Sequence, residues 1–165
     1  MSDNIGDLFL TFSHDRLKLF LSRIVDCLGR LSEEQIWMRG SENENAIGNL
    51  VLHLCGNVRQ WIVSGVFGAQ DIRDRHAEFE ARGTGTKQAL QTRIETVVGQ
   101  ALEGIKTLPP HRLAERITVQ NTETTVLQAI YAVVEHFSYH TGQIIFATKM
   151  LTRQDLGYFK HLNRK

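Results

Sequence analysis

The stretch VLQAIYAVVEHFSYHTGQIIFATKML, residues 126–151, is the most informative part of the chain. Its apolar residues and its length predict a long helix. His136 and His140 are four residues apart within it, so their imidazoles leave the same face of the helix. Imidazole nitrogens bind zinc, nickel, copper or iron at about 2.0–2.1 Å. The pair therefore indicates a metal site, although two ligands alone rarely suffice.

Three more helices are predicted before this one. Apolar residues recur at helical spacing over residues 5–28, 46–66 and 90–105. Pro109 and Pro110 end the third pattern, and Thr122 or Thr124 is expected to cap the last helix, which reaches about Leu151. Four amphipathic helices predict an all-α protein, a four-helix bundle whose ligand sites lie between facing helices.

The connections between these helices are long. Residues 67–85 combine glycines with charges and are expected to form a polar connection, and residues 116–120 are expected to be extended. Connections of this length in a small domain are often functional. The charged residues of the first connection either line a substrate mouth or form a solvated loop, and the second interpretation is favoured; they are Asp71, Arg73, Asp74 and Arg75. The basic tail from Arg153 is expected to lie outside the helices.

Length and composition exclude several classes of protein. The 165 residues fit one domain, 1–165, which is large enough to fold without a structural metal. A net charge of +1 does not predict binding to nucleic acid or to anionic lipid. No apolar run predicts a secretory leader or a membrane span. Cys27 and Cys55 lie in apolar patterns and are expected to be free, buried thiols. These features predict a reduced, cytoplasmic protein.

His53 is the candidate third ligand, because it lies on a polar stripe of an otherwise apolar helix. Asn49 and Asn57 are one turn on either side of it, well placed to orient a ligating imidazole through hydrogen bonds. Gln143 is expected to do the same beside His140. A second interpretation remains open, in which His53 is a core residue whose ring nitrogens bond to a carbonyl or to water.

The other histidines differ in their surroundings. His14 shares a stripe with apolar residues of the first predicted helix, so it is either a fourth ligand or part of the rim of the bundle. The three that lie in polar or loop segments are expected to be solvated; they are His76, His111 and His161. The sequence contains no HExxH, G-x-S-x-G, P-loop or Rossmann glycine motif, and neither cysteine has the setting of a nucleophile.

Three stretches resemble the DinB-like, or YfiT-like, four-helix proteins. They are NLVLHLCGN at residues 49–57, EHFSYHTGQI at 135–144 and RDRHAEF at 73–79, the last resembling an uncharacterised subgroup. The resemblance implies a bundle of the DinB-like type with long inter-helix connections. It also implies that His53, His136 and His140 bind a divalent metal whose shell is completed by water. Characterised relatives carry out thiol-dependent transferase or isomerase chemistry.

Two functions follow from these features. The first is a metal-dependent enzyme whose zinc or nickel ion keeps a position open for water, thiolate or substrate. It would act on a small molecule as a hydrolase or as an S-transferase that uses a low-molecular-weight thiol. The second is a non-catalytic, stress-related or interaction bundle whose histidines form a structural polar network or an idle metal site. A homodimer is expected in either case, since symmetric pairs are the commonest soluble oligomers.

Overall fold

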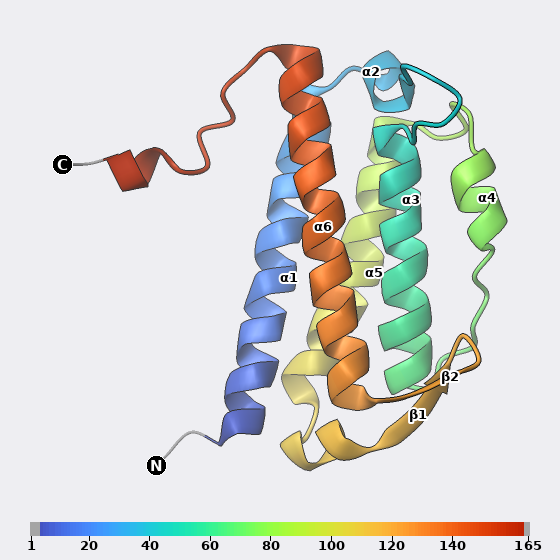
Figure 1. The fold of residues 1–165 in the computed structure, drawn as a ribbon, viewed down its shortest axis with the longest axis vertical. Helices are drawn as coiled ribbons and strands as arrows, with labels where there is room; N and C mark the ends of the chain where they lie inside the picture. The colour runs from blue at the N-terminus through green and yellow to red at the C-terminus, as the bar shows by residue number, and fades with distance from the viewer. Residues whose placement is uncertain (1–3, 164–165) are drawn as a thin grey trace.

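The computed structural model describes residues 4–163, which are mostly helical. The longest helices are α1 (Ile5–Arg30), α3 (Ile47–Val58), α5 (Lys87–Thr107) and α6 (Val126–Thr152), and they lie side by side (Figure 1). A π-helix, η1 (Arg59–Val66), continues α3 directly. The smaller elements are α2 (Glu33–Trp37), α4 (Arg75–Glu80), the 3-10 helices η2 (Pro110–Ala114) and η3 (Lys160–Asn163), and the strands β1 (Arg116–Val119) and β2 (Thr122–Thr125).

The core lies between the four long helices. α1 packs against α5 and α6, and α3 packs against the same two helices, so each long helix has two neighbours. The apolar positions that predicted the helices are the buried ones, with fully buried side chains on all four, including Leu17, Leu54, Ile94 and Phe137. None of the described helices is long and apolar enough to cross a membrane. The predicted helical content is confirmed, and α1 extends through Gly29 to Arg30.

The connection over residues 67–85 contains a short helix that the sequence did not predict. It contains α4, which begins where the Asp74 carboxylate accepts a hydrogen bond from the backbone N–H of Ala77 at 3.0 Å. This helix packs against α3 and buries Glu78. Six residues are too few to give a helical period, and so short a helix is stable only through its tertiary contacts.

The segment before α6 also differs from the prediction. Residues 116–120 were expected to be extended, and β1 confirms this for all but Gln120, which lies in the turn. Thr122 and Thr124 lie in β2 and not at the helix cap. Thr125 caps α6 instead. Gln120 and Asn121, with φ of 51° and 57°, form the tight turn of the hairpin. Without glycine at this turn, the sequence signal for a hairpin was weak.

The C-terminal tail folds back onto α1. The Tyr158 hydroxyl donates a hydrogen bond to the Asp26 carboxylate at 2.7 Å, and Leu156 is buried. Most other residues between Arg153 and Leu162 are exposed, as expected of a tail outside the helices.

Candidate metal centre

Three histidines meet between α3 and α6. His53 comes from α3, and His136 and His140 come from α6; one ring nitrogen from each lies within 4.8 Å of the others. The side chains of His53 and His140 are buried, with 6% and 9% exposure, and His136 is half-buried. The structure therefore brings together the three residues that the sequence singled out. His53 and His136, which are in direct contact, are 83 positions apart in the sequence.

An ion pair holds the ring of His53. Its Nδ1 lies 2.9 Å from Oε2 of Glu78. Arg73 binds the same carboxylate with two bonds, from Nε to Oε1 at 2.7 Å and from Nη2 to Oε2 at 2.9 Å. Burial alone would raise the pKa of Glu78, but the hydrogen bonds from Arg73 and His53 lower that pKa below its ordinary value. Glu78 is therefore an ionised carboxylate.

The charge on Glu78 decides the tautomer of His53. An ionised carboxylate only accepts hydrogen bonds. Nδ1 of His53 therefore carries the ring proton and donates a hydrogen bond to Oε2. Nη2 of Arg73 lies 3.1 Å from the same Nδ1, but a guanidinium only donates, so with the proton on Nδ1 this contact is not a hydrogen bond and Nη2 donates to Oε2 of Glu78 at 2.9 Å. The lone pair of His53 is consequently on Nε2, which lies 2.8 Å from Nε2 of His136. A carboxylate–histidine pair of this kind is the usual support of a ligating imidazole.

Gln143 orients the second ring in the same manner. Nδ1 of His140 lies 2.7 Å from Oε1 of Gln143, one turn further along α6. A carbonyl oxygen can only accept, so Nδ1 of His140 donates and its Nε2 keeps a lone pair. Gln143 thus has the position beside His140 that the sequence predicted.

All three rings fit a divalent cation. Burial and then the neighbouring His140 and His53 lower the pKa of His136 to about 4, and burial lowers the pKa of His140. Both rings are therefore neutral at pH 7 and can bind an ion. Nitrogen ligands at about 2.1 Å from one ion lie roughly 3 Å apart, so small rotations of the imidazoles would complete the geometry. Three imidazoles suit zinc or nickel.

The low pKa of His136 predicts a pH dependence of folding in metal-free protein. An unfolded chain binds a proton at this residue below its ordinary pKa of 6.5, whereas the folded chain does so only near 4. Protonation therefore favours unfolding, and the melting temperature should fall as the pH decreases from 6.5 to 4. His136→Gln should reduce this slope, and His111→Gln, at an exposed position, should not. Equal slopes for all three proteins would contradict the prediction.

Within residues 4–163, neither predicted asparagine forms a hydrogen bond with the ring of His53. The amide of Asn49 donates to the carbonyl oxygens of Glu78 at 2.9 Å and Ala81 at 3.0 Å, and its Oδ1 accepts from Arg39 at 2.6 Å. Asn49 therefore holds α4, and with it Glu78, against α3. Asn57 lines a cavity beside His136, and its buried Oδ1 has no hydrogen-bond partner within residues 4–163.

The sequence analysis did not assign Arg73 and Glu78 to this centre. The glycine at position 56 is the sequence feature that could have pointed to them. Arg73 was expected in a solvated loop, but its side chain is only 3% exposed, and Glu78 was not identified as a site residue. A glycine inside an apolar helix lowers helix propensity, so it often has a packing reason such as the close approach of another segment. A Cβ atom on Gly56 would touch the Glu78 carboxylate and lie 2.8 Å from Nε of Arg73. His14, on α1, bonds to Asp15 at 3.0 Å and is outside the histidine cluster of the described chain.

A cavity of about 520 Å³ opens beside His136. The π-helix η1 contributes Trp61, and the hairpin turn contributes Gln120. Its lining is completed by residues of α3 and α6, namely Asn57, Ala132, Val133, Glu135, His136 and Tyr139. Because one of the three histidines forms part of its wall, a small molecule in this cavity would reach the histidine cluster.

Comparison with known proteins gives a family and a shared fold. A family model described as "Protein of unknown function (DUF1572)" matches residues 4–162. A solved structure, described as that of a conserved protein from Enterococcus faecalis, is 12% identical and covers 87% of this chain and 97% of its own, with a TM-score of 0.73. That likeness shows the fold alone. No curated protein matches the chain significantly. Because the family model spans nearly the whole sequence, this protein belongs to the DUF1572 family, whose function is unknown.

Proposed function

We propose that the protein is a metal-dependent enzyme on a four-helix bundle of the DinB-like type, with His53, His136 and His140 as ligands of a divalent cation. The convergence of three imidazoles on one point, beside an open cavity, carries this proposal. Two further observations support it: Glu78 and Gln143 fix the Nδ1 atoms of His53 and His140, so that Nε2 of each ring is the available ligand atom.

The chemistry we propose is attack on a small electrophile by a thiol or by water. A divalent ion held by three imidazoles lowers the pKa of a bound thiol or water. The chain's own residues would position the substrate in the cavity beside His136: Trp61 and Tyr139 offer aromatic surface, and Gln120 offers an amide. The sequence resemblance favours a low-molecular-weight thiol as one substrate and S-transfer as the reaction, with hydrolysis as the second candidate.

One contact favours a non-catalytic alternative. Nε2 of His53 lies 2.8 Å from Nε2 of His136, so a proton between them would make a hydrogen bond. In this alternative the histidines form a structural polar network in an interaction or stress-related protein. Removing one ring would then leave a buried partner unpaired and lower the free energy of unfolding by about 1–3 kcal/mol.

His136→Ala distinguishes the two functions. As an enzyme site, the variant should lose most of the bound metal and retain the helical circular dichroism of the unchanged protein, because His136 is only half-buried. His111→Ala, at an exposed position, is the matched control and should keep the metal. Elemental analysis of protein purified without metal-affinity resin measures the metal. Unchanged metal content in His136→Ala, together with a lower melting temperature, would support the structural network instead.

Turnover assays then test the reaction itself. The metal-loaded protein should convert an electrophile such as 1-chloro-2,4-dinitrobenzene in the presence of a low-molecular-weight thiol, and a chelator should abolish the activity until metal is restored. A parallel assay with ester and amide substrates, without thiol, reports hydrolysis. Activity that survives in His136→Ala would contradict a role for the histidine site in either reaction.

A further inference from the structure

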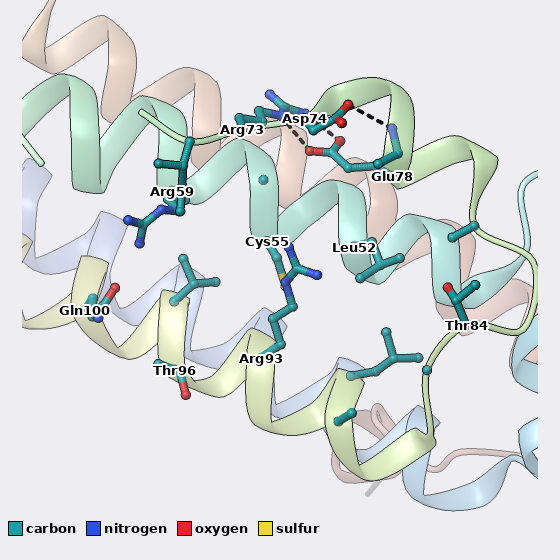
Figure 2. A pocket seen from close by; sticks show the side chains of 18 of the residues that line it. Leu52, Cys55, Arg59, Arg73, Asp74, Glu78, Thr84, Arg93, Thr96 and Gln100 are labelled. Atoms are coloured by element: carbon teal, nitrogen blue, oxygen red, sulfur yellow. Dashed lines mark hydrogen bonds and ion pairs between the residues drawn. The ribbon is translucent and has the colours of Figure 1, made fainter. Parts of the chain in front are cut away.

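A second cavity, of about 720 Å³, lies between α3, α4 and α5 (Figure 2). None of the three histidines lines it. The helix α3 and the start of η1 contribute Leu52, Cys55, Gly56 and Arg59, which follow one another at helical spacing on a different face from His53. The cavity therefore shares no residue with the cavity beside His136, and it adjoins the candidate metal centre only through Arg73 and Glu78, which lie behind His53.

Two arginines reach into this cavity from facing helices. Figure 2 shows the side chain of Arg59, at the start of η1, and that of Arg93, on α5, extending into the space between the helices. Within residues 4–163 neither arginine takes part in an ion pair, and the buried Nε of Arg59 has no hydrogen-bond partner. The charge of Arg93 also acts on the buried thiol of Cys55: burial raises the pKa of Cys55 to about 12, and Arg93 opposes that rise. Arg93 is itself exposed, and Figure 2 shows its side chain extending from α5 toward Cys55.

The acidic residues that line the cavity form no ion pair with either arginine, although Arg59 also acts on Asp71, which lies outside the lining. Glu78 is bound by Arg73 at 2.7 Å, so this pair is internally neutral. Asp74 is the other acidic residue of the lining, and its Oδ1 accepts the capping hydrogen bond of α4. Because the charges of Arg73 and Glu78 neutralise each other, the charges that remain on the lining are the two positive arginines and the negative Asp74.

The remainder of the lining is apolar at one end. Trp37 lines this end, where its indole N–H donates to the carbonyl oxygen of Gly85 at 3.0 Å. Leu52 and Leu90 add aliphatic surface there, while Thr96 and Gln100 add hydrogen-bonding groups near the arginines, beside Val97. Figure 2 places Thr96 and Gln100 on the same stretch of α5 as Arg93. The cavity therefore has a basic end and an apolar end.

We propose that this cavity binds a small amphipathic anion, with its oxyanion head between Arg59 and Arg93 and its apolar part against Trp37 and Leu52. Guanidinium groups bind carboxylate and phosphate oxygens through paired hydrogen bonds, which suits a head group held from two helices. The volume is in the range of sites for small organic molecules. This proposal does not rest on the metal centre, since no residue that would bind the anion is a candidate metal ligand.

Tryptophan fluorescence provides the test. The chain has two tryptophans, so Trp61→Phe leaves Trp37 as the sole reporter at this cavity. Titration of this protein with octanoate should change the fluorescence saturably, and octanol should bind at least about tenfold more weakly. Adding Arg59→Gln or Arg93→Gln should weaken octanoate binding by about tenfold or more while leaving octanol binding unchanged. Arg116→Gln, at a side chain that is 83% exposed, is the matched control and should change neither.

Comparison of octyl phosphate with octanoate in the same titration identifies the head group. Tighter binding of octyl phosphate than of octanoate, with the same loss in the arginine variants, would support the proposal and assign a phosphate head. The reverse order would assign a carboxylate. The proposal is overturned if neither anion gives a saturable signal at millimolar concentration, or if octanol and octanoate bind equally in all variants. Circular dichroism of each variant confirms that its helices are intact.

Discussion

Glu78→Ala should lower the free energy of unfolding by about 3 kcal/mol, the largest loss expected from a single change around the histidines. The substitution leaves the guanidinium of Arg73 without its carboxylate, although the Arg73 side chain is only 3% exposed. It also removes the acceptor that fixes Nδ1 of His53 at 2.9 Å, so metal affinity should fall about 10- to 100-fold. Urea unfolding of metal-free protein measures the first effect, and metal titration measures the second.

A double variant separates these two effects. Arg73→Met combined with Glu78→Leu removes both charges, and replacing a buried pair by apolar residues of similar size is often neutral or stabilising. The double variant should therefore recover most of the stability lost in Glu78→Ala, yet bind metal as weakly as Glu78→Ala does. Recovery of metal affinity together with stability would mean that the carboxylate has no direct part in orienting His53.

Gly56→Ala should lower the free energy of unfolding by about 2–3 kcal/mol, even though alanine is the better helix former. The new Cβ atom would overlap Oε1 of Glu78 and lie 2.8 Å from Nε of Arg73, which forces the ion pair away from α3. Because the same carboxylate holds His53, metal binding should weaken as well. Thermal unfolding and metal titration of the variant measure these two consequences.

Gly99→Ala is the control for this substitution. Gly99 lies within α5, and a Cβ atom added there would meet no other atom within 4 Å. No steric overlap should therefore offset the higher helix propensity of alanine, and the free energy of unfolding of the variant should rise by about 0.5–1 kcal/mol. Equal effects of the two substitutions would show that α4 does not press on α3 at Gly56.

The sequence predicted the long helices well, because their apolar residues recur with helical periodicity, and it singled out the three histidines that meet between α3 and α6. The apolar spacing of residues 5–28 and 90–105 closely anticipated α1 and α5. The i, i+4 spacing likewise placed His136 and His140 on one face of α6. His53 was selected because it interrupts an apolar pattern, and such an interruption is visible without a structure.

The supporting residues could not be predicted in the same way, since they depend on contacts between distant segments. Glu78 reaches His53 only because α4 folds back on α3, and a six-residue helix has no period to reveal which side is buried. The role of Asn49 was also misjudged: its amide bonds to the backbone of α4 and not to the neighbouring histidine. One turn of helix brings side chains near each other, but it does not decide which of them bond.

The placement of the histidines also has a topological consequence. His53 and His136 come from α3 and α6, 83 positions apart in the chain, and the segment between them includes α4, α5 and the hairpin. An ion shared by the two would close this span into a loop and act as a reversible cross-link. Loop closure restricts the unfolded chain far more than the folded one. The same ion that we propose for catalysis would therefore also tie the middle of the chain to its last helix, and its release would loosen both together.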